Sequence, residues 1–471
     1  MELYERLEQI LAELRPAFRR EATYDWFIIL MWGVLLCHQA PAVTSYLNAL
    51  GLGERCYEQA LHWFHSSAFG IDEVCERWGD WLASHHCAHR LRGQLVYVGD
   101  GIKVGKEGRK MPGVKGMHQE SEDVSKPEWL RGHYFSALAL LLSREKAMFA
   151  APVLLKLHDG LGAVAEDEGT LVEKMAQLCV MLMPKGSYAV LDAYYASTKV
   201  LGPFRKAGLH LISRVRSSTV VYSGFCPLPG KRLPGRPRKW GERVKLQDLF
   251  APIDACESAE VWLYGQLQTV YFQCFKLHWD DPKTRLLFVL TQLANGKRII
   301  LLSSDLSLTG AEVIQAYGWR FKIELTFRTL LQLLGGFSYR FWLKAMTPSK
   351  RWPQPLELPT QEPEPFKIQV LAKVEAFERF VNLSAIALGI LQVLSLEMSQ
   401  AVWRHFPVWF RTLPSHGYPT EQVVRISLQH LQLAVLANSR QGLLLHQLLA
   451  QKNPRSRAPS KPPHLVENLK P

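Results

Sequence analysis

Three acidic residues occupy positions from which they could hold metal ions together. Asp100 closes the apolar run "YVGDG", Asp192 closes "VLDAYY", and Glu324 lies in the helical stretch "AYGWRFKIELTFRTL". A carboxylate at the end of a buried strand is costly to desolvate unless it is paired, protonated or bound to a cation. Hard oxygen ligands suit Mg²⁺, and three carboxylates suffice to hold two ions about 3.5–4 Å apart. We therefore predict Asp100, Asp192 and Glu324 as catalytic residues and as ligands of two Mg²⁺ ions, for which Mn²⁺ can substitute.

Each aspartate also has a simpler explanation. Most Asp-Gly and Asp-Ala junctions begin a turn or cap a helix, and either aspartate alone favours that interpretation. Two strand-end aspartates followed by a helical glutamate are harder to explain as coincidence, because together they supply the ligands for two-metal phosphoryl transfer. In that chemistry one ion activates a water or a DNA 3′-hydroxyl, and the other stabilises the leaving oxygen.

The residues around Glu324 form a stripe on one face of the predicted helix. Residues three, four and seven apart share a face, which aligns Tyr317, Arg320, Glu324 and Arg328. Taken alone, the stripe favours a solvated face, because Arg–Glu pairs four residues apart are common there. Downstream of two strand-end aspartates, it favours an inward-facing Glu324 with Arg320 and Arg328 on either side to bind phosphates. The Tyr317 hydroxyl would brace the same face.

The elements that would position these residues change in character along the chain. Residues 1–90 have helical spacing broken at Pro16 and at glycine turns, so we expect a helical N-terminal region for DNA binding or assembly. Short β-branched runs then predict strands at "GQLVYVGDGIKVG", "GHYFSALALLL", "AAPVLLKLH" and "GSYAVLD", with a helix before the last. Three strands, a helix and a strand, with a late helix that carries an acid, predict an α/β fold with an RNase H-like catalytic core.

We place the domain boundaries by these changes in pattern. The first part of the core spans residues 91–215, and the core helix with the third acid lies in residues 309–345. Between them, residues 216–308 indicate an inserted antiparallel β-rich subdomain, because strand patterns alternate with turns at "DDPK" and "ANGK". Residues 346–452 are expected to form a proline-rich loop and a C-terminal helical region, and residues 453–471 a disordered tail.

Two basic segments extend the predicted DNA contacts. "GKRLPGRPRKWGERVK" has a Gly-Arg-Pro centre that resembles the minor-groove hook of architectural proteins. "DGIKVGKEGRKMPGVKG" begins at Asp100 and is interrupted by glycines. Either could be a solvated loop, but basic clusters on nucleases usually neutralise phosphates. The residues predicted to bind DNA in these segments are Arg236, Arg238, Lys239, Lys103, Lys106, Arg109 and Lys110.

Composition restricts the class of protein. With 471 residues and 48% hydrophobic side chains, the chain can bury a large core, which excludes a disordered protein. Fifty-six Lys and Arg against 43 Asp and Glu give a net charge of +13, which favours an anionic partner such as nucleic acid. The longest uncharged apolar run has 12 residues, from Trp26 to Cys37. That is too short for a bilayer core of about 30 Å, so we expect a buried helix and no membrane partner.

The cysteines favour a reducing compartment. Eight cysteines are scattered without a CxxC pair, which predicts neither a disulfide framework nor a zinc module. The cluster "SHHCAHR", with His85, His86, Cys87 and His89, lacks the second ligand pair of structural zinc sites. We therefore expect no metal there, and the charged N-terminus predicts no signal peptide.

The acid-bearing blocks resemble a known family. "VGDGIKVGKEGRKMPGVKGMHQES", "LDAYYAS" and "YGWRFKIELTFRTLLQLLGGFSYRFW" are similar to blocks of DDE transposases of bacterial insertion sequences, in the insertion-sequence-four-like superfamily. The resemblance covers about residues 92–345 and includes the spacing tyrosine-x2-arginine-x3-glutamate. It departs at Leu331, where the family pattern has a lysine seven residues after the glutamate. Arg328, on the same helix face, could supply that cation.

The resemblance implies an RNase H-like endonuclease of DNA transposition and recombination. Such an enzyme binds double-stranded DNA at terminal inverted repeats, cuts the element ends and joins the 3′-OH to target DNA at a Mg²⁺ site. A homodimer on the DNA and a bacterial cytoplasmic, nucleoid-associated location are implied in the same way. Two alternatives stay open: an inactive transposase-derived DNA-binding protein, which Leu331 motivates, and another RNase H-like nuclease that acts on branched DNA.

Overall fold

The computed structural model describes residues 2–119, 127–158, 169–224, 240–263, 265–279, 284–293, 295–349, 364–409, 417–437 and 443–452. The predicted DNA-binding residues Arg236, Arg238 and Lys239 lie outside the described residues, as do most of the proline-rich loop and the whole predicted tail. Those assignments stay predictions.

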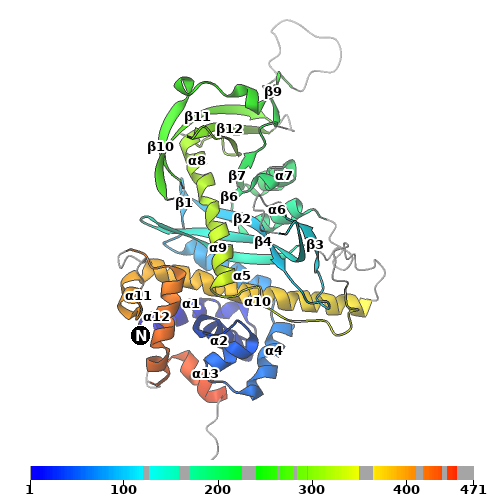
Figure 1. The fold of residues 1–471 in the computed structure, drawn as a ribbon, viewed down its shortest axis with the longest axis vertical. Helices are drawn as coiled ribbons and strands as arrows, with labels where there is room; N and C mark the ends of the chain where they lie inside the picture. The colour runs from blue at the N-terminus through cyan, green and yellow to red at the C-terminus, as the bar shows by residue number, and fades with distance from the viewer. Residues whose placement is uncertain are drawn as a thin grey trace, which may run out of the picture.

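The predicted core strands form one half of a large sheet (Figure 1). They are β2 (Gln94–Gly105), β4 (Trp129–Arg144), β5 (Ala147–Leu157), β6 (Tyr188–Leu191) and β7 (His210–Val215). Their order in the sheet is β5-β4-β2-β6-β7. β4 is antiparallel to both β5 and β2, whereas β2, β6 and β7 are parallel to one another. Two short strands, β1 (Arg90–Leu91) and β3 (Lys115–His118), pair with β2 and β4.

The strands of the predicted insert continue this sheet. They are β8 (Val220–Tyr222), β9 (Arg243–Lys245), β10 (Glu257–Leu263), β11 (Gln266–His278), β12 (Arg285–Leu293) and β13 (Arg298–Ser303). All their mutual pairings are antiparallel, as predicted. The structure differs from a separate subdomain in that β13 also pairs with β7, with Ile300 opposite Val215. This pairing covers an edge of β7 whose backbone groups would otherwise be open.

Helices lie on both faces of the sheet. α6 (Leu171–Leu182) and α7 (Thr198–Ala207) connect the parallel strands, whereas α8 (Gly310–Trp319) and α9 (Phe321–Gln332) run across the sheet from β10 towards the helical body (Figure 1). α8 begins with a capping box, in which the Thr309 hydroxyl accepts from the Glu312 N–H and the Glu312 carboxylate accepts from the Thr309 N–H. This cap satisfies backbone donors that a helix start leaves unpaired.

Helices from the two ends of the chain form a single body next to the sheet (Figure 1). Its members are α1 (Glu2–Glu13), α2 (Glu21–Leu36), α3 (Val43–Ala49), α4 (Tyr57–His65), α5 (Ile71–Ser84), α10 (Glu364–Glu397), α11 (Ser399–His405), α12 (Glu421–Ala437) and α13 (Leu444–Lys452). Tyr4 on α1 donates a hydrogen bond of 2.8 Å to the carbonyl oxygen of Leu428 on α12. The sequence predicted two helical regions; the structure joins them because each buries apolar side chains against the other.

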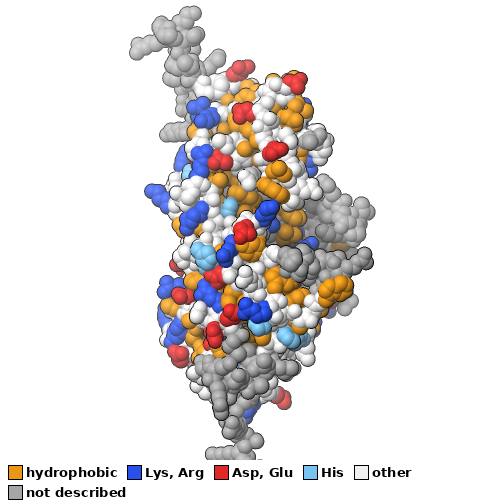
Figure 2. All heavy atoms as spheres, turned by 90° about the vertical axis from the view of Figure 1, so that its left-hand side faces the viewer, with side chains coloured by type: hydrophobic (Ala, Val, Ile, Leu, Met, Phe, Trp, Pro, Cys, Tyr) orange, Lys and Arg blue, Asp and Glu red, His pale blue; other side chains and the backbone are white. Residues whose placement is uncertain are grey.

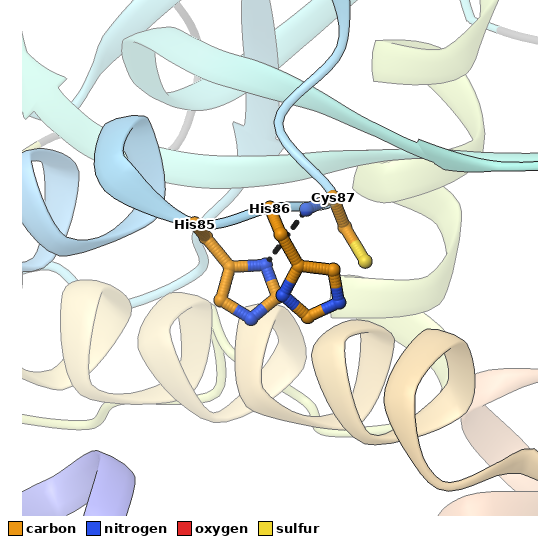
Figure 3. A group of neighbouring side chains, drawn as sticks. All are labelled: His85, His86 and Cys87. Carbon is orange, nitrogen blue, oxygen red and sulfur yellow. Dashed lines mark hydrogen bonds between the residues drawn. The ribbon is translucent and has the colours of Figure 1, made fainter.

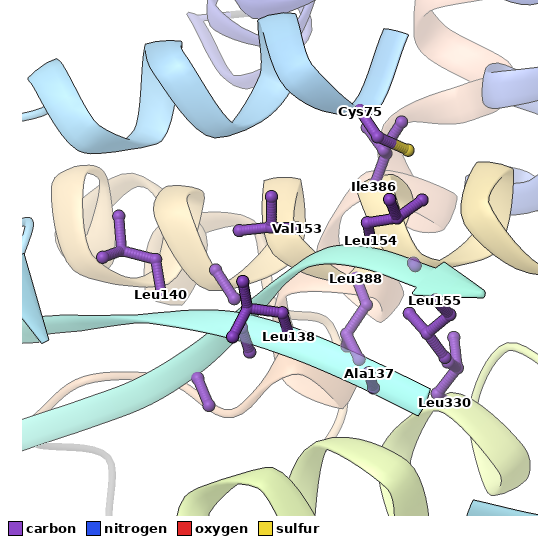
Figure 4. Packing of buried hydrophobic residues seen from close by; sticks show 14 of the residues in the cluster. Cys75, Ala137, Leu138, Leu140, Val153, Leu154, Leu155, Leu330, Ile386 and Leu388 are labelled. Carbon is purple, nitrogen blue, oxygen red and sulfur yellow. The ribbon is translucent and has the colours of Figure 1, made fainter. Parts of the chain in front are cut away.

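The long helix α10 connects the helical body to the sheet. By length and composition it could cross a membrane, but 94% of its most apolar window is buried inside the protein. Asn382 on α10 both accepts from and donates to the backbone of Leu155 on β5, at 2.8 Å each. Figure 4 shows apolar side chains of β4 and β5 packed with Leu330 of α9 and with Ile386 and Leu388 of α10. The apolar character of α10 is therefore that of a core helix.

Candidate active site

Strand register brings the two predicted aspartates together. β2 and β6 are neighbouring parallel strands whose last paired residues are Gly99 and Leu191. Asp100 is the next residue of β2, and Asp192 immediately follows the end of β6. Because adjacent strands lie about 4.8 Å apart, both carboxylates are at the same point of the sheet. Glu324, in the first turn of α9, approaches them from the helices above.

One guanidinium contacts all three acids. Arg320 Nη1 donates to Asp100 Oδ2 at 2.9 Å, and Nη2 donates to Glu324 Oε1 at 2.7 Å. Its Nε lies 3.9 Å from Asp192 Oδ1, and the Tyr317 hydroxyl donates to the same oxygen at 3.4 Å. The structure thus brings together five residues that the sequence predicted to lie at one site. The sequence did not predict that Arg320 points at the carboxylates, since the stripe was expected to turn its arginines towards phosphates.

Arg320 also separates two helices that the sequence predicted as one. α8 ends at Trp319 and α9 begins at Phe321, but Arg320 itself keeps helical dihedrals, with φ −50° and ψ −36°. The backbone therefore continues in nearly the same direction, and the stripe remains on one side. From this position between the two helices, the Arg320 side chain reaches both aspartates and the glutamate one turn later.

Burial and like charges shape the electrostatics of the acids. Burial, together with the nearby carboxylates of Asp192 and Glu324, raises the pKa of Asp100 to about 6, although Arg320 and the Gly101 N–H act to lower it. The Gly101 N–H donates to Asp100 Oδ1 at 2.7 Å. Burial opposes the charge of Arg320, but the acids outweigh it and raise its pKa. The cluster therefore favours a cation among its oxygens.

Steric crowding explains why the residues on either side of Asp100 are glycines. A Cβ at Gly99 would lie 2.7 Å from Leu191 Cδ2, and a Cβ at Gly101 would overlap the Tyr134 hydroxyl. The Tyr134 and Tyr195 hydroxyls lie 3.2 Å apart and are buried. Sequence reasoning missed these two tyrosines as supports of the site, although Tyr195 lies in the quoted block "LDAYYAS".

The acid cluster fits the predicted metal ligands. Three carboxylates from β2, the end of β6 and α9 converge within reach of one side chain, and carboxylate oxygens are what Mg²⁺ prefers. Their side chains are 24%, 41% and 43% exposed for Asp100, Asp192 and Glu324, so the cluster is open to solvent. Ions bound among the same oxygens would require the Arg320 guanidinium to turn away.

The other predicted DNA-binding residues lie in different surroundings. Arg328 is exposed one turn beyond Glu324, in the predicted position. Lys103 is also exposed and donates to the His118 carbonyl oxygen at 2.7 Å. Because successive side chains of a strand point to opposite faces, Lys103 lies on the other face of β2 from Asp100. Its ammonium therefore lies on the other side of the sheet from the acids, and its predicted role in DNA binding stays a prediction.

Lys106 differs most from its predicted position. It is buried, and its ammonium donates to the Phe337 carbonyl oxygen and lies 3.6 Å from the centroid of the Tyr339 ring. A buried ammonium with these partners connects β2 to the segment after α9, and it does not face solvent where DNA would bind. The glycine-rich sequence around Lys106 resembles that of a basic surface loop. The Tyr339 ring that covers its ammonium is far away in the sequence, so only the fold shows the contact. Arg109 and Lys110 remain at the surface of this segment.

His85, His86 and Cys87 form a second group of possible ligands (Figure 3). One ligand atom of each lies within 4.8 Å of the others. Both ring nitrogens of His85 are engaged: Nδ1 accepts from the Cys87 N–H at 3.2 Å, and Nε2 lies 2.7 Å from Glu397 Oε1. Glu397 also pairs with Arg6 at 2.9 Å. This ion-pair network, which joins α1 and α10 to the end of α5, accounts for the grouping.

Comparisons with known proteins now bear on the class of protein. Residues 165–341 match the family model described as "Transposase DDE domain". The match includes Asp192, Tyr317, Arg320 and Glu324 and begins after Asp100. This part of the chain is therefore similar to the DDE domain of transposases.

Curated proteins and solved structures were also compared with the chain. No curated protein matches the sequence. Six chains of solved structures match, among them a cryo-EM structure of a piggyBac transposase synaptic complex with hairpin DNA. That chain is 12% identical, the match covers 99% of this chain and 86% of that one, and the TM-score is 0.37. A score that low carries no argument about a shared fold.

Proposed function

We propose that this protein is a Mg²⁺-dependent transposase of a bacterial insertion sequence, in the insertion-sequence-four-like superfamily. It binds double-stranded DNA at the terminal inverted repeats of its element, cleaves there and joins the 3′-OH to target DNA. The convergence of Asp100, Asp192 and Glu324 on Arg320 carries the proposal. The DDE-domain match supports the same chemistry.

We further propose that the five core strands belong to an RNase H-like core. One support is the sheet order β5-β4-β2-β6-β7, in which three antiparallel strands are followed by two parallel ones. The other is the position of Asp100 and Asp192, directly after the last paired residues of β2 and β6. A homodimer on the DNA and a nucleoid-associated cytoplasmic location are parts of the same proposal.

The chain's own residues have defined tasks in this mechanism. Asp100 and Asp192 present oxygens from adjacent strands, and Glu324 presents a third from the helix. When bound, two Mg²⁺ ions would activate the attacking oxygen and stabilise the leaving one. The Tyr317 hydroxyl holds the Asp192 carboxylate in orientation. Arg320, once released from the acids, carries a planar fork of donors that suits a phosphate.

The test is a cleavage and strand-transfer assay on a labelled DNA end taken from the flanks of the encoding gene. Unmutated protein, Glu324→Gln and the control Glu76→Gln, an exposed glutamate on α5, are compared with and without Mg²⁺. We expect Mg²⁺-dependent 3′-OH formation by the unmutated protein and the control but not by Glu324→Gln. Cleavage that persists in Glu324→Gln would overturn the proposal.

Leu331 supports one alternative, a DNA-binding protein that has lost cleavage. It lies one heptad after Glu324 on α9 and is 44% exposed, where the related pattern has a lysine. Specific binding of the element end without cutting in Mg²⁺ or Mn²⁺ would select this alternative. Cutting that follows the shape of branched DNA, regardless of the terminal sequence, would instead indicate another nuclease.

A further inference from the structure

A large basic hollow lies away from the acid cluster. Its volume is about 1570 Å³, and it is formed by the loop after β2, the start of β4 and the segment after α9. On the face in Figure 2, acidic and basic side chains are interspersed. The hollow is different, because five of its lining residues are basic and only Glu107 is acidic. Arg109, Lys110, Arg340 and Trp342 reach the surface of the hollow, whereas Lys106 is buried.

Among the residues that the structure describes, no carboxylate forms an ion pair with Arg109, Lys110 or Arg340. Arg109 Nε donates to the Ser349 carbonyl oxygen at 2.8 Å, and Lys110 Nζ donates to the Lys344 carbonyl oxygen at 3.1 Å. Those bonds fix the two side chains but leave their charge in place. Arg340 is exposed and has no hydrogen-bond or ion-pair partner among the residues that the structure describes. An anion is therefore the expected occupant.

Trp342, which lines the same hollow, is an exposed tryptophan. Trp342 is 66% exposed, although a large aromatic ring normally gains stability from burial. The segment that carries it is held in place, because Tyr339 is buried beneath the Lys106 ammonium and its hydroxyl donates to His133 Nδ1 at 2.6 Å. His133 Nε2 in turn donates to the Pro112 carbonyl oxygen at 2.8 Å. Trp342 thus projects from a rigid support.

These features select a class of ligand. The hollow exceeds the roughly 300–1000 Å³ typical of small-molecule sites. A basic groove with an aromatic platform is the arrangement by which proteins bind single-stranded nucleic acid, with phosphates on the cations and a base stacked on the ring. A paired base inside a duplex cannot offer its face to Trp342 in this way.

We propose that this groove binds an unpaired stretch of DNA, with a base stacked on Trp342 and phosphates held by Arg340, Arg109 and Lys110. That the nucleic acid is DNA rests on the proposed function. The groove begins at Gly105, five residues along β2 from Asp100, which corresponds to about 17 Å. The groove would hold DNA strands that separate next to the cut.

The test measures binding of a fluorescent 12-nucleotide oligothymidine to the full-length protein in EDTA, with a hairpin duplex of equal length as competitor. The variants are Trp342→Ala and Arg340→Ala. The controls are Trp409→Ala, whose ring is 82% exposed, and Arg77→Ala, an exposed arginine on α5. We expect Trp342→Ala to weaken single-strand binding roughly 5- to 100-fold. Arg340→Ala should lower the slope of log Kd against log salt by about 0.7.

The outcomes of this binding experiment separate the groove proposal from the proposed function. Loss confined to Trp342→Ala and Arg340→Ala, with the controls unchanged, supports the proposal even if the protein cuts no DNA, in which case only the proposed function fails. Unchanged single-strand binding in both variants, in a protein that does cut DNA, overturns this proposal alone. Equal losses in the Trp409→Ala control, or duplex binding that depends on Trp342 as strongly as single-strand binding, would also overturn it.

Discussion

The Arg320 guanidinium donates to the Asp100 carboxylate at 2.9 Å across 220 residues of sequence, and the same side chain also reaches Glu324 at 2.7 Å. Arg320 is 18% exposed, so this ion pair lies in partly desolvated surroundings. Without metal, this one cation offsets part of the negative charge of the three acids to which metal ions are predicted to bind.

Arg320→Ala should therefore destabilise the protein without metal and increase its response to metal. Removing the guanidinium from these partly buried carboxylates costs about 1–3 kcal/mol, which for a chain of this size lowers Tm by a few degrees. We expect a lower Tm in EDTA and a larger Tm increase on adding Mg²⁺ than in the unmutated protein. Differential scanning calorimetry measures both. Arg328→Ala, an exposed residue of the same stripe, is the control; an equal Mg²⁺ response in all three proteins would contradict the prediction.

Gly101→Ala should disrupt the acid cluster through Tyr134. The new methyl would overlap the Tyr134 hydroxyl, and overpacking of this kind typically costs about 1–3 kcal/mol. We expect a lower Tm and loss of DNA cleavage, because Asp100 would be displaced with its strand. Gly105→Ala on the same strand is the matched control, since its Cβ would meet only Leu130 Cδ1 at 3.3 Å. Comparable Tm losses in the two variants would show that the strand, not this contact, limits stability.

Glu397 should make stability depend on acid pH. Burial acts to raise its pKa, but hydrogen bonds from His85 and Arg6 hold it down, at about 2. Because the pKa in the folded state lies below the ordinary value of 4.5, its contribution is present above that value and lost as pH falls towards 2. A difference of that size corresponds to roughly 3 kcal/mol, and the Glu397 side chain is only 12% exposed.

Glu397→Gln should therefore lower the free energy of unfolding at pH 7 and have progressively less effect below pH 4.5. Urea titrations over this range measure it. Glu2→Gln is the control, because its partner Arg404 is 64% exposed and such surface pairs contribute at most about 1 kcal/mol. A Glu397→Gln penalty that is constant from pH 7 to pH 3 would contradict the prediction.

Lys106→Met should affect stability and leave DNA contacts unchanged. The substitution keeps the apolar stem but removes a buried ammonium that lies over the Tyr339 ring, and burial lowers the pKa of this ammonium to about 8. We expect a loss of about 1–3 kcal/mol in the free energy of unfolding and an unchanged salt dependence of DNA binding. Lys110→Met gives the contrast, with little change in stability and a shallower salt slope. A shallower slope for Lys106→Met would instead assign this residue to phosphate binding.

Several features of this protein can be derived from its sequence because they depend on local pattern. Aspartates that close apolar β-runs, and a stripe of polar residues at helical spacing, are enough to single out Asp100, Asp192 and Glu324. Antiparallel pairing in the insert and the burial of the 26–37 helix follow in the same way. Such patterns are set by residues within about one turn or one strand, where periodicity of 2.0 or 3.6 relates side chains directly.

Other features were decided only by the tertiary structure. The burial of Lys106, the continuation of the core sheet through β13, and the union of the two terminal helical regions all depend on partners that are distant in the sequence. The direction of Arg320 belongs to this group as well, because a stripe shows which residues share a helix face but not what that face meets. Long-range pairing depends on which apolar faces and strand edges can cover one another. Local sequence patterns do not show which of the possible pairings is the most stable.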